Sequence, residues 1–522
     1  GLSLFFPILI LRNTQMHYAL LLLLLLASDI DAPLRNGISS TCDIPHELEQ
    51  KLHADPTALK EASTDFGNAV HFAPSSVFFP SSVEEIRTLI RSSYQCSHPF
   101  VISAKGNGHS TDGQAMAEHG VVIDMRELRK SRMATGITIS DDRSYADVGG
   151  EMLWSDVLNS SLSRGVMPVS WTDYLELTVG GTLSNAGISG QTFRFGPQIS
   201  NVLEMDVVTG KGEVVTCSAS KKPELFFSVL GGLGQFGIIT RARIPLKPAK
   251  QRVLWTRLLY TNFTQFARDQ ESIIAINGNR KASAVGYMEG QILLDNGTPN
   301  EWETSFFPRT ILPTIFSLVK SYGVVYCLEI AEPYFSSEAA AARKKMKSVV
   351  KGLSPIPGLV SQVDVLYVDF LERVQAQEDE EVSHPWMTLF VPRSRISEFN
   401  DGVVKDILLR RNISFGPLLI YPLNKSKWNP RMSAAIPNEE VFYAVSLLFN
   451  CMTKDLDAYI TQNNDVMTFC ADKGIALKRY LHSYSTEEQW IQHFGRKWRT
   501  ISSRKMEFDP KHILSPGQRI FN

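Results

Sequence analysis

The chain has 522 residues, of which 43% are hydrophobic and 20% are charged, and its formal net charge is -1. This length predicts two or three domains, and the composition is that of a soluble globular protein. Because the charge is balanced, nothing favours nucleic acid or an acidic membrane surface as a partner, and both function classes are set aside.

The first 32 residues are interpreted as a leader. Residues 2–11 are apolar, and Leu20–Leu26 is an unbroken leucine run that follows Met16. Such a run is shorter than the roughly 20 residues that span a bilayer, and it resembles the core of a secretory signal peptide. The alternative is a retained anchor made of both runs. We expect a secreted, vacuolar or other endomembrane protein with no stable membrane span in the mature chain.

Sequons and cysteines agree with the secretory interpretation. Six cysteines are scattered without a C-x-x-C or zinc spacing, so no structural metal is expected, one or two disulfides are allowed, and most cysteines are expected to be small buried hydrophobes. Five sequons predict a glycoprotein: Asn159, Asn262, Asn296, Asn412 and Asn424.

A β-α-β unit is predicted ahead of a glycine-rich loop. Leucines at helical spacing predict a helical entry over residues 43–64. Residues 77–80 and 101–104 are apolar runs typical of strands, and residues 83–94 have helical spacing after serines that suit an N-cap. The loop that follows contains Gly106 and Gly108. Alternate glycines permit positive φ, so that backbone N–H groups can converge on a pyrophosphate. The alternative is an ordinary turn carrying a surface histidine, His109.

Further along, residues 178–190 form a second glycine-dense stretch, typical of a backbone that approaches a ligand closely. Pro245 and Pro248 mark a domain boundary. Strands are predicted over residues 121–124, 145–150, 202–208, 213–217, 238–246, 253–259, 284–287, 322–331, 387–391 and 440–448, and helices over 151–164, 223–230, 336–350 and 453–466. The stretch after residue 476 is expected to return to the first domain.

Several motifs, taken together from about residue 45 to the C-terminus, strongly resemble the plant cytokinin oxidase/dehydrogenases, flavoenzymes of the vanillyl-alcohol-oxidase type. They are GNGHS at 106–110, WTDYL at 171–175, TVGGTLSNAGISGQ at 178–191, GPQISNVLEMD at 196–206, HPW at 384–386 and LSPGQ at 514–518. The resemblance implies an α+β fold with two lobes. The FAD-binding domain would comprise residues 40–248 and 476–522, and residues 249–475 would form a substrate domain with an antiparallel sheet flanked by helices.

The resemblance also implies the cofactor site. His109 would carry covalently attached FAD, and a tethered flavin is a stronger oxidant that cannot dissociate. The other residues implied around FAD are Lys105, Gly106, Asn107, Gly108, Ser110, Gln114, Asp173, Thr178, Ser184, Ile188, Ile238, Tyr480, Ser515 and Gln518. For the last three, the alternative is a packed C-terminal tail.

Two acids carry the substrate chemistry that the resemblance implies. Asp173, expected to be desolvated among aromatic neighbours with a raised pKa, would accept a hydrogen bond or proton from the side-chain amine of a cytokinin. Glu289 would hold the adenine ring, and Glu378 and Trp386 would contact substrate. On bare sequence each acid is more simply a solvated loop carboxylate. Relatives commonly carry Asn where this chain has Thr388, so the preferred side chain of the substrate is open.

The sequence therefore predicts an FAD-dependent oxidoreductase acting on CH–NH groups. It would cleave isopentenyladenine or zeatin to adenine and an unsaturated aldehyde, and pass electrons to a quinone-type acceptor. The family resemblance implies a monomer. The alternatives are a covalent-flavin oxidase of the same fold that acts on sugars or alcohols, and a non-catalytic hormone-binding protein.

Overall fold

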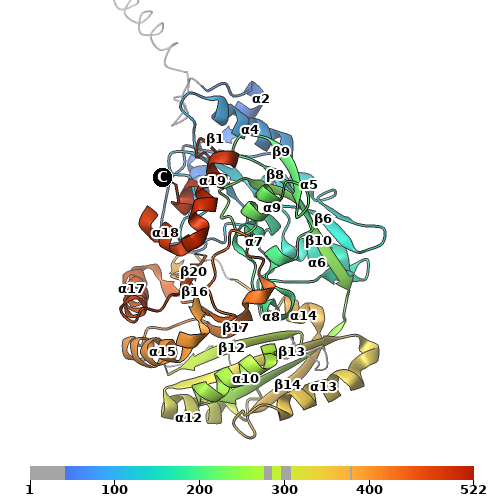
Figure 1. Ribbon diagram of the computed structural model, residues 1–522, viewed down its shortest axis with the longest axis vertical. Coiled ribbons are helices and arrows are strands. Elements are labelled where there is room, and N and C mark those ends of the chain that lie inside the picture. The colour runs from blue at the N-terminus through green and yellow to red at the C-terminus, as the bar shows by residue number, and fades with distance from the viewer. Residues whose placement is uncertain (1–41, 276–284, 296–306, 377–378, 482, 522) are drawn as a thin grey trace, which may run out of the picture.

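The computed structural model describes residues 42–275, 285–295, 307–376, 379–481 and 483–521 (Figure 1). The predicted leader, Asn296 and Glu378 lie outside the described residues. In the part of the chain that is described, no helix combines the length and the apolar character that crossing a membrane requires.

The first sheet positions the glycine-rich loop. Its four strands have the order β1-β2-β4-β3, and β4 pairs in parallel with both β2 and β3. Helices α3 and α4 begin at side-chain caps, since Asp55 accepts from Ala58 N and Ser82 accepts from Glu85 N. The elements are α2 (His46–Glu49), β1 (Leu52–His53), α3 (Pro56–Ala62), β2 (Ser76–Phe78), α4 (Val83–Gln95), β3 (Ile102–Lys105), β4 (Val121–Asp124) and α5 (Met125–Arg132).

The continuous helical entry predicted over 43–64 is wrong. Two short helices, α2 and α3, are separated by strand β1. Pro56 occupies the first turn of α3, where its missing N–H costs nothing, and it could not have stood inside a longer helix. A disulfide joins Cys42 to Cys96 at the end of α4, and the other four cysteines are buried and form no disulfide.

The second sheet lies beside the first and contains six strands, with β10 paired to β6, β7 and β8. Helices α6 and α7 pack on it through a core that includes Trp154, Val179 and Leu183. The elements are β5 (Ile137–Ile139), β6 (Tyr145–Gly149), α6 (Trp154–Leu162), β7 (Val166–Pro168), α7 (Val179–Asn185), α8 (Thr192–Phe195), β8 (Glu204–Val208), β9 (Val214–Ser218), α9 (Pro223–Val229) and β10 (Ile238–Pro248).

The third sheet has eight strands in the order β14-β11-β13-β12-β17-β18-β16-β20, all antiparallel. Its elements are β11 (Arg252–Tyr260), α10 (Phe263–Ala275), β12 (Tyr287–Leu294), α12 (Leu312–Tyr322), β13 (Val324–Tyr334), α13 (Ala339–Lys351), β14 (Val360–Leu366), α14 (Tyr367–Leu371), β16 (Met387–Pro392), α15 (Ile396–Phe399), a π-helix (Asn400–Leu408), α16 (Leu409–Arg411), β17 (Leu418–Asn424), β18 (Val441–Leu447), α17 (Leu456–Asp472) and β20 (Lys478–Tyr480), with a separate two-stranded pair β15 (Val382–Ser383) and β19 (Cys451–Met452).

Successive residues of this sheet face two different cores, as strand geometry requires. Tyr287 and Phe390 pack toward α6 and α7, whereas their neighbours Met288 and Leu389 pack toward α10 and the π-helix. Helices α10 and α13 cover the face of the sheet that is turned away from the first lobe (Figure 1), whereas α12 packs on the opposite face against Leu293 and Val325. Strand β12 runs over 287–294 rather than ending at 287 as predicted.

The C-terminal segment closes the first lobe. After α18 (Glu487–Phe494), helix α19 (Trp498–Phe508) packs against α9 (Figure 1). The tail then runs beside β3, where Ile102 N donates to Ile513 O at 2.8 Å and Ser515 N donates to Ile102 O at 2.8 Å. Residues 513–515 thus lie beside β3, the strand that precedes the glycine-rich loop.

Candidate active site

The glycine-rich loop that follows β3 needs its two glycines for different reasons. Gly108 has φ +74°, as predicted, whereas Gly106 does not have positive φ. A Cβ on Gly106 would lie 2.4 Å from Thr178 Oγ1, the side chain that caps α7. The first glycine therefore permits close approach of the second glycine-dense stretch, and the second glycine permits the turn that presents His109.

The His109 imidazole is enclosed by aromatic side chains. Its ring lies 4.0 Å from Phe66 at 15°, 4.8 Å from Tyr174 and 5.8 Å from Trp386. Its Nε2 atom is buried and has no hydrogen-bond partner among the described residues. Burial lowers the pKa of His109 to about 4. The ring is therefore neutral at physiological pH and keeps a nitrogen lone pair.

A short segment, the 65–68 strap, clamps this loop. Phe66 N donates to Gly108 O at 2.9 Å and Gly67 N donates to Ser110 O at 3.0 Å. Asp65 Oδ2 accepts from Ser110 Oγ at 2.9 Å and from Gly113 N at 2.8 Å. Burial raises the pKa of Asp65 to about 6. The sequence interpretation missed this strap, because its partners lie far along the chain and its local pattern resembles an ordinary turn.

The polar residues predicted around the loop also tie it to neighbouring segments. Lys105 Nζ donates to the carbonyls of Glu61 and Thr64, so its side chain braces the loop against the end of α3. Asn107 Nδ2 donates to Glu176 O at 2.8 Å, and Gln114 Nε2 donates to Leu481 O at 3.1 Å.

The remaining residues predicted around FAD lie in the second glycine-dense stretch, on β10, on β20 and in the returning tail. Ser184 Oγ donates to Gly180 O at 2.7 Å, and Tyr480 OH accepts from Gly187 N at 3.1 Å. Ser515 Oγ donates to Gly234 O at 3.0 Å. Ile188 packs against the apolar core, and Ile238 and Gln518 are buried.

Both predicted acids meet at an arginine that the sequence interpretation did not select. Arg373 Nη2 lies 3.0 Å from Asp173 Oδ1 and donates to Tyr287 OH at 2.5 Å. Tyr287 OH in turn donates to Asp173 Oδ1 at 3.4 Å. Asp173 differs from the expectation of a carboxylate desolvated by apolar neighbours, since its side chain is 26% exposed and pairs with a cation.

Glu289 lies deeper, on β12, and is buried. Burial raises its pKa well above the usual range, and the neighbouring Asp173 carboxyl raises it further. Its Oε1 atom has no hydrogen-bond partner among the residues described. A neutral carboxyl with one free oxygen can serve a ligand as donor or acceptor.

Trp386 immediately precedes β16 of the third sheet and reaches the strap, where its ring lies 5.0 Å from Phe66. His384, two residues earlier, stacks on the other face of Phe66 at 3.8 Å and its Nδ1 lies 2.6 Å from Phe66 O. The lobe that contains Glu289 and the lobe that contains His109 therefore meet at Phe66. His109, Tyr174 and Trp386, which belong to three separate motifs, are brought together there.

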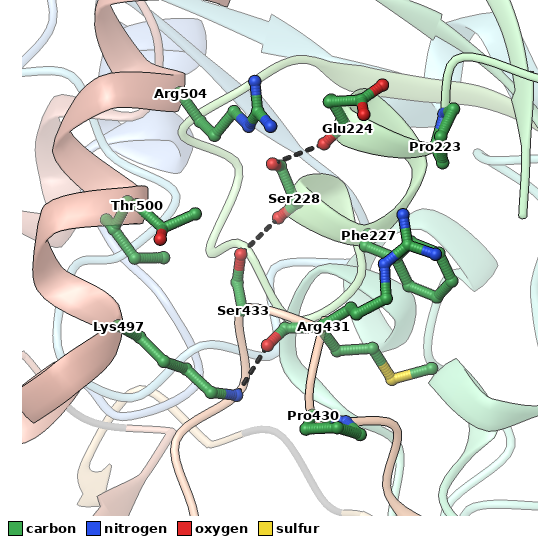
Figure 2. Close-up of a pocket in the computed structure, with 12 residues that line it drawn as sticks. Pro223, Glu224, Phe227, Ser228, Pro430, Arg431, Ser433, Lys497, Thr500 and Arg504 are labelled. Atoms are coloured by element: carbon green, nitrogen blue, oxygen red, sulfur yellow. Dashed lines mark hydrogen bonds between the residues drawn. The ribbon is translucent and has the colours of Figure 1, made fainter.

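A surface pocket of about 270 Å³ lies elsewhere, between α9, α19 and the loop at 430–433 (Figure 2). No residue of the predicted site lines it. Its polar groups bond to one another, since Ser433 Oγ donates to Ser228 O at 2.7 Å and Lys497 Nζ donates to Met432 O at 2.6 Å. Among the described residues, no group of three or more His, Cys, Asp or Glu could hold a metal ion.

Comparison with known proteins identifies the family. A family model described as cytokinin dehydrogenase 1, FAD and cytokinin binding, matches residues 250–521, and an FAD-binding-domain model matches residues 74–218. Cytokinin dehydrogenase 3 of Arabidopsis thaliana is 47% identical over 91% of both chains. Cytokinin dehydrogenase 5 of the same plant is 48% identical over 91% of this chain and 89% of its own.

Solved structures share the fold at low identity. Xylooligosaccharide oxidase from Myceliophthora thermophila matches with a TM-score of 0.64 and 14% identity, over 88% of this chain and 95% of its own. A flavoprotein of the vanillyl-alcohol-oxidase type from the same fungus gives 0.63 and 14%, over 90% and 86%. The predicted α+β fold class is thereby confirmed. The chain belongs to the cytokinin dehydrogenase family, as its motifs predicted.

Proposed function

We propose that this chain is an FAD-dependent cytokinin dehydrogenase that cleaves the N6-isoprenoid side chain of adenines such as isopentenyladenine and zeatin. One observation carries this function beyond family membership. Tyr174, the neighbour of Asp173, lies 4.8 Å from the His109 ring, so the substrate acid and the flavin attachment residue belong to one site. A hormone-binding protein would require neither residue.

The residues present suit a covalently held flavin. A bond from the imidazole to the flavin ring requires an unprotonated nitrogen, and the low pKa of His109 supplies one. Gly106, Gly108 and the 65–68 strap hold the loop in one conformation. A cofactor would meet the loop backbone in that conformation. FAD bound there, held also by the residues predicted on α7, β20 and the tail, supplies the acceptor for a hydride from the substrate.

The protein side chains then do three things. Asp173 accepts a hydrogen bond or proton from the secondary amine, which raises electron density at the adjacent methylene. Glu289 fixes the purine through its free Oε1 atom. Trp386 and the aromatic strap exclude bulk water from the reacting bond. Loss of two electrons and two protons converts the CH–NH group to an imine, which one water molecule hydrolyses to adenine and the unsaturated aldehyde.

The electrons leave on a quinone-type acceptor, or slowly on oxygen, and the working enzyme is the monomer predicted from the family resemblance. We place the protein in the secretory route. The Cys42–Cys96 disulfide supports this, because such bonds persist in oxidising compartments. Asn159, Asn262 and Asn412 are exposed sequons, whereas Asn424 is half-buried and donates to Phe193 O. Glycopeptide mass spectrometry tests this route, with glycans expected at the three exposed sites.

A turnover assay tests the function. Purified protein is mixed with isopentenyladenine and dichlorophenolindophenol, and adenine is measured together with dye bleaching. Stoichiometric adenine and bleaching support the proposal. Bleaching with a sugar or alcohol alone would assign the chain to another oxidase class, and hormone bound without turnover would make it a binding protein.

A further inference from the structure

Arg373 lies at the centre of the acid cluster and is held there rigidly. It follows α14, and its side chain is 9% exposed. The guanidinium lies 4.2 Å from the Phe370 ring centroid and 5.0 Å from that of Tyr287, and Nη1 donates to Phe370 O at 2.9 Å. With its plane fixed by aromatic rings and a carbonyl, Nη2 can point only at Asp173 and Tyr287.

Other charged groups near Arg373 are already paired, which leaves its guanidinium to the carboxyls of Asp173 and Glu289. Glu329, another carboxylate that interacts with Arg373, already pairs with Arg257 at 2.6 Å and accepts from Gln291 at 3.2 Å. The phenols of Tyr287, Tyr367 and Tyr421 also face the cluster, and burial raises the pKa of each. Arg373 is the cation that both Asp173 and Glu289 face.

The distances show which of the two carboxyls pairs with the Arg373 guanidinium. Nη2 is 3.0 Å from Asp173, and the hydroxyl of Tyr287 donates to the same Oδ1 atom. The Asp173 carboxyl is therefore the one that the cation and the phenol orient, whereas Glu289 contacts the cluster through Asp173 and Tyr287.

We propose that Arg373 is a positioning residue for the reaction: together with Tyr287 it holds the Asp173 carboxyl in the orientation in which that group accepts the substrate N–H. This rests on the proposed function and adds the residue that orients the acceptor. Without Arg373, the cation that favours the charged form of this carboxyl would be lost, and the acceptor would form only at higher pH.

The test is the pH dependence of kcat/KM and kcat for the flavin-loaded enzyme with isopentenyladenine. In Arg373→Met we expect the acidic limb to move up by about one to three pH units, the range over which an opposite charge shifts a carboxyl. Arg373→Lys should move it less and in the same direction. Arg252→Met is the control, because it removes another arginine–aspartate pair, with Asp364, away from the site, and its profile should match the wild type.

A second readout separates positioning from folding. In an Asp173→Asn background, Arg373→Met should lower turnover by less than twofold further, since the partner is already gone. A folded Arg373→Met or Arg373→Lys enzyme with a wild-type pH profile would overturn the proposal, as would full additivity with Asp173→Asn. Wild-type enzyme that fails to release adenine would instead refute the proposed function, so the two failures are distinguishable.

Discussion

Phe66 stacks on His109 with ring centroids 4.0 Å apart and planes 15° apart, and its opposite face carries His384 at 3.8 Å. His109, the proposed flavin attachment residue, is thus oriented by a ring that His384 of the other lobe holds in place. The environment of His109 therefore depends on the contact between the two lobes as well as on the glycine-rich loop.

Replacing Phe66 with Ala should release the His109 ring. Three aromatic contacts worth about 1 kcal/mol each, with His109, His384 and Trp386, would be lost, so the free energy of unfolding should fall by roughly 3 kcal/mol. Covalent flavin incorporation should slow severalfold, because the imidazole would no longer be held in one orientation. The measurement is protein-bound flavin fluorescence after denaturation, with Phe66→Tyr as the control that keeps the ring. Normal incorporation in Phe66→Ala would contradict this role.

Lys505 and Asp509 form a buried ion pair that fixes the returning tail. Their side chains are 1% and 0% exposed and 2.7 Å apart, and Asp509 also accepts from Ile513 N and Leu514 N. Because Lys505→Met leaves the Asp509 charge buried, unfolding free energy should fall by about 3 to 5 kcal/mol. Arg504→Met, which breaks the more exposed pair with Glu507, should cost less than about 1 kcal/mol. Thermal or denaturant unfolding measures both, and equal losses would contradict the assignment.

Asp65 should make stability depend on pH. Its pKa rises on folding from 3.8 to about 6, so the folded state prefers the protonated form. The stability it contributes is complete below pH 3.8 and is lost as the pH rises through 6, on the order of 3 kcal/mol. The wild type should therefore lose stability relative to Asp65→Asn between pH 4 and pH 7. Melting temperatures of the two proteins across that range test the sign, and a relative gain by the wild type would refute it.

Thr388 lies on β16, at the position where the family resemblance implies Asn in relatives. Its hydroxyl donates to Ser446 Oγ at 3.1 Å on the neighbouring strand, and it pairs with Tyr480. Thr388→Asn places a longer amide there, which should change the kcat/KM ratio of isopentenyladenine to zeatin severalfold, while flavin content stays the same. Thr388→Val, which keeps the shape and removes the hydroxyl, is the matched control. An unchanged ratio in Thr388→Asn would exclude the position from specificity.

Contiguous motifs allowed the first lobe to be predicted well. The β3 strand, the turn at Gly108 and helix α4 follow from local signals, namely a β-branched run, a glycine and a capping serine. Strand β12 was cut short, because Gly290 interrupts its apolar pattern. The structure gives the physical reason for that glycine: a Cβ there would lie 2.1 Å from Ile420 O on β17.

The partners of the predicted residues could not be predicted in the same way. Asp173 and Arg373 are separated by 200 residues, and neither sequence context refers to the other. Phe66 likewise gains its role only when His384 arrives from the third sheet. Local patterns identified the groups that carry chemistry, whereas the side chains that set their charge and orientation emerged from tertiary packing.

The account depends most directly on the covalent bond between His109 and FAD. Its test is the mass of the peptide that contains His109, taken from active enzyme that has been denatured and washed free of unbound flavin. The account predicts a peptide heavier by one FAD, with yellow colour retained on the polypeptide. An unmodified His109 peptide from fully active enzyme would contradict it.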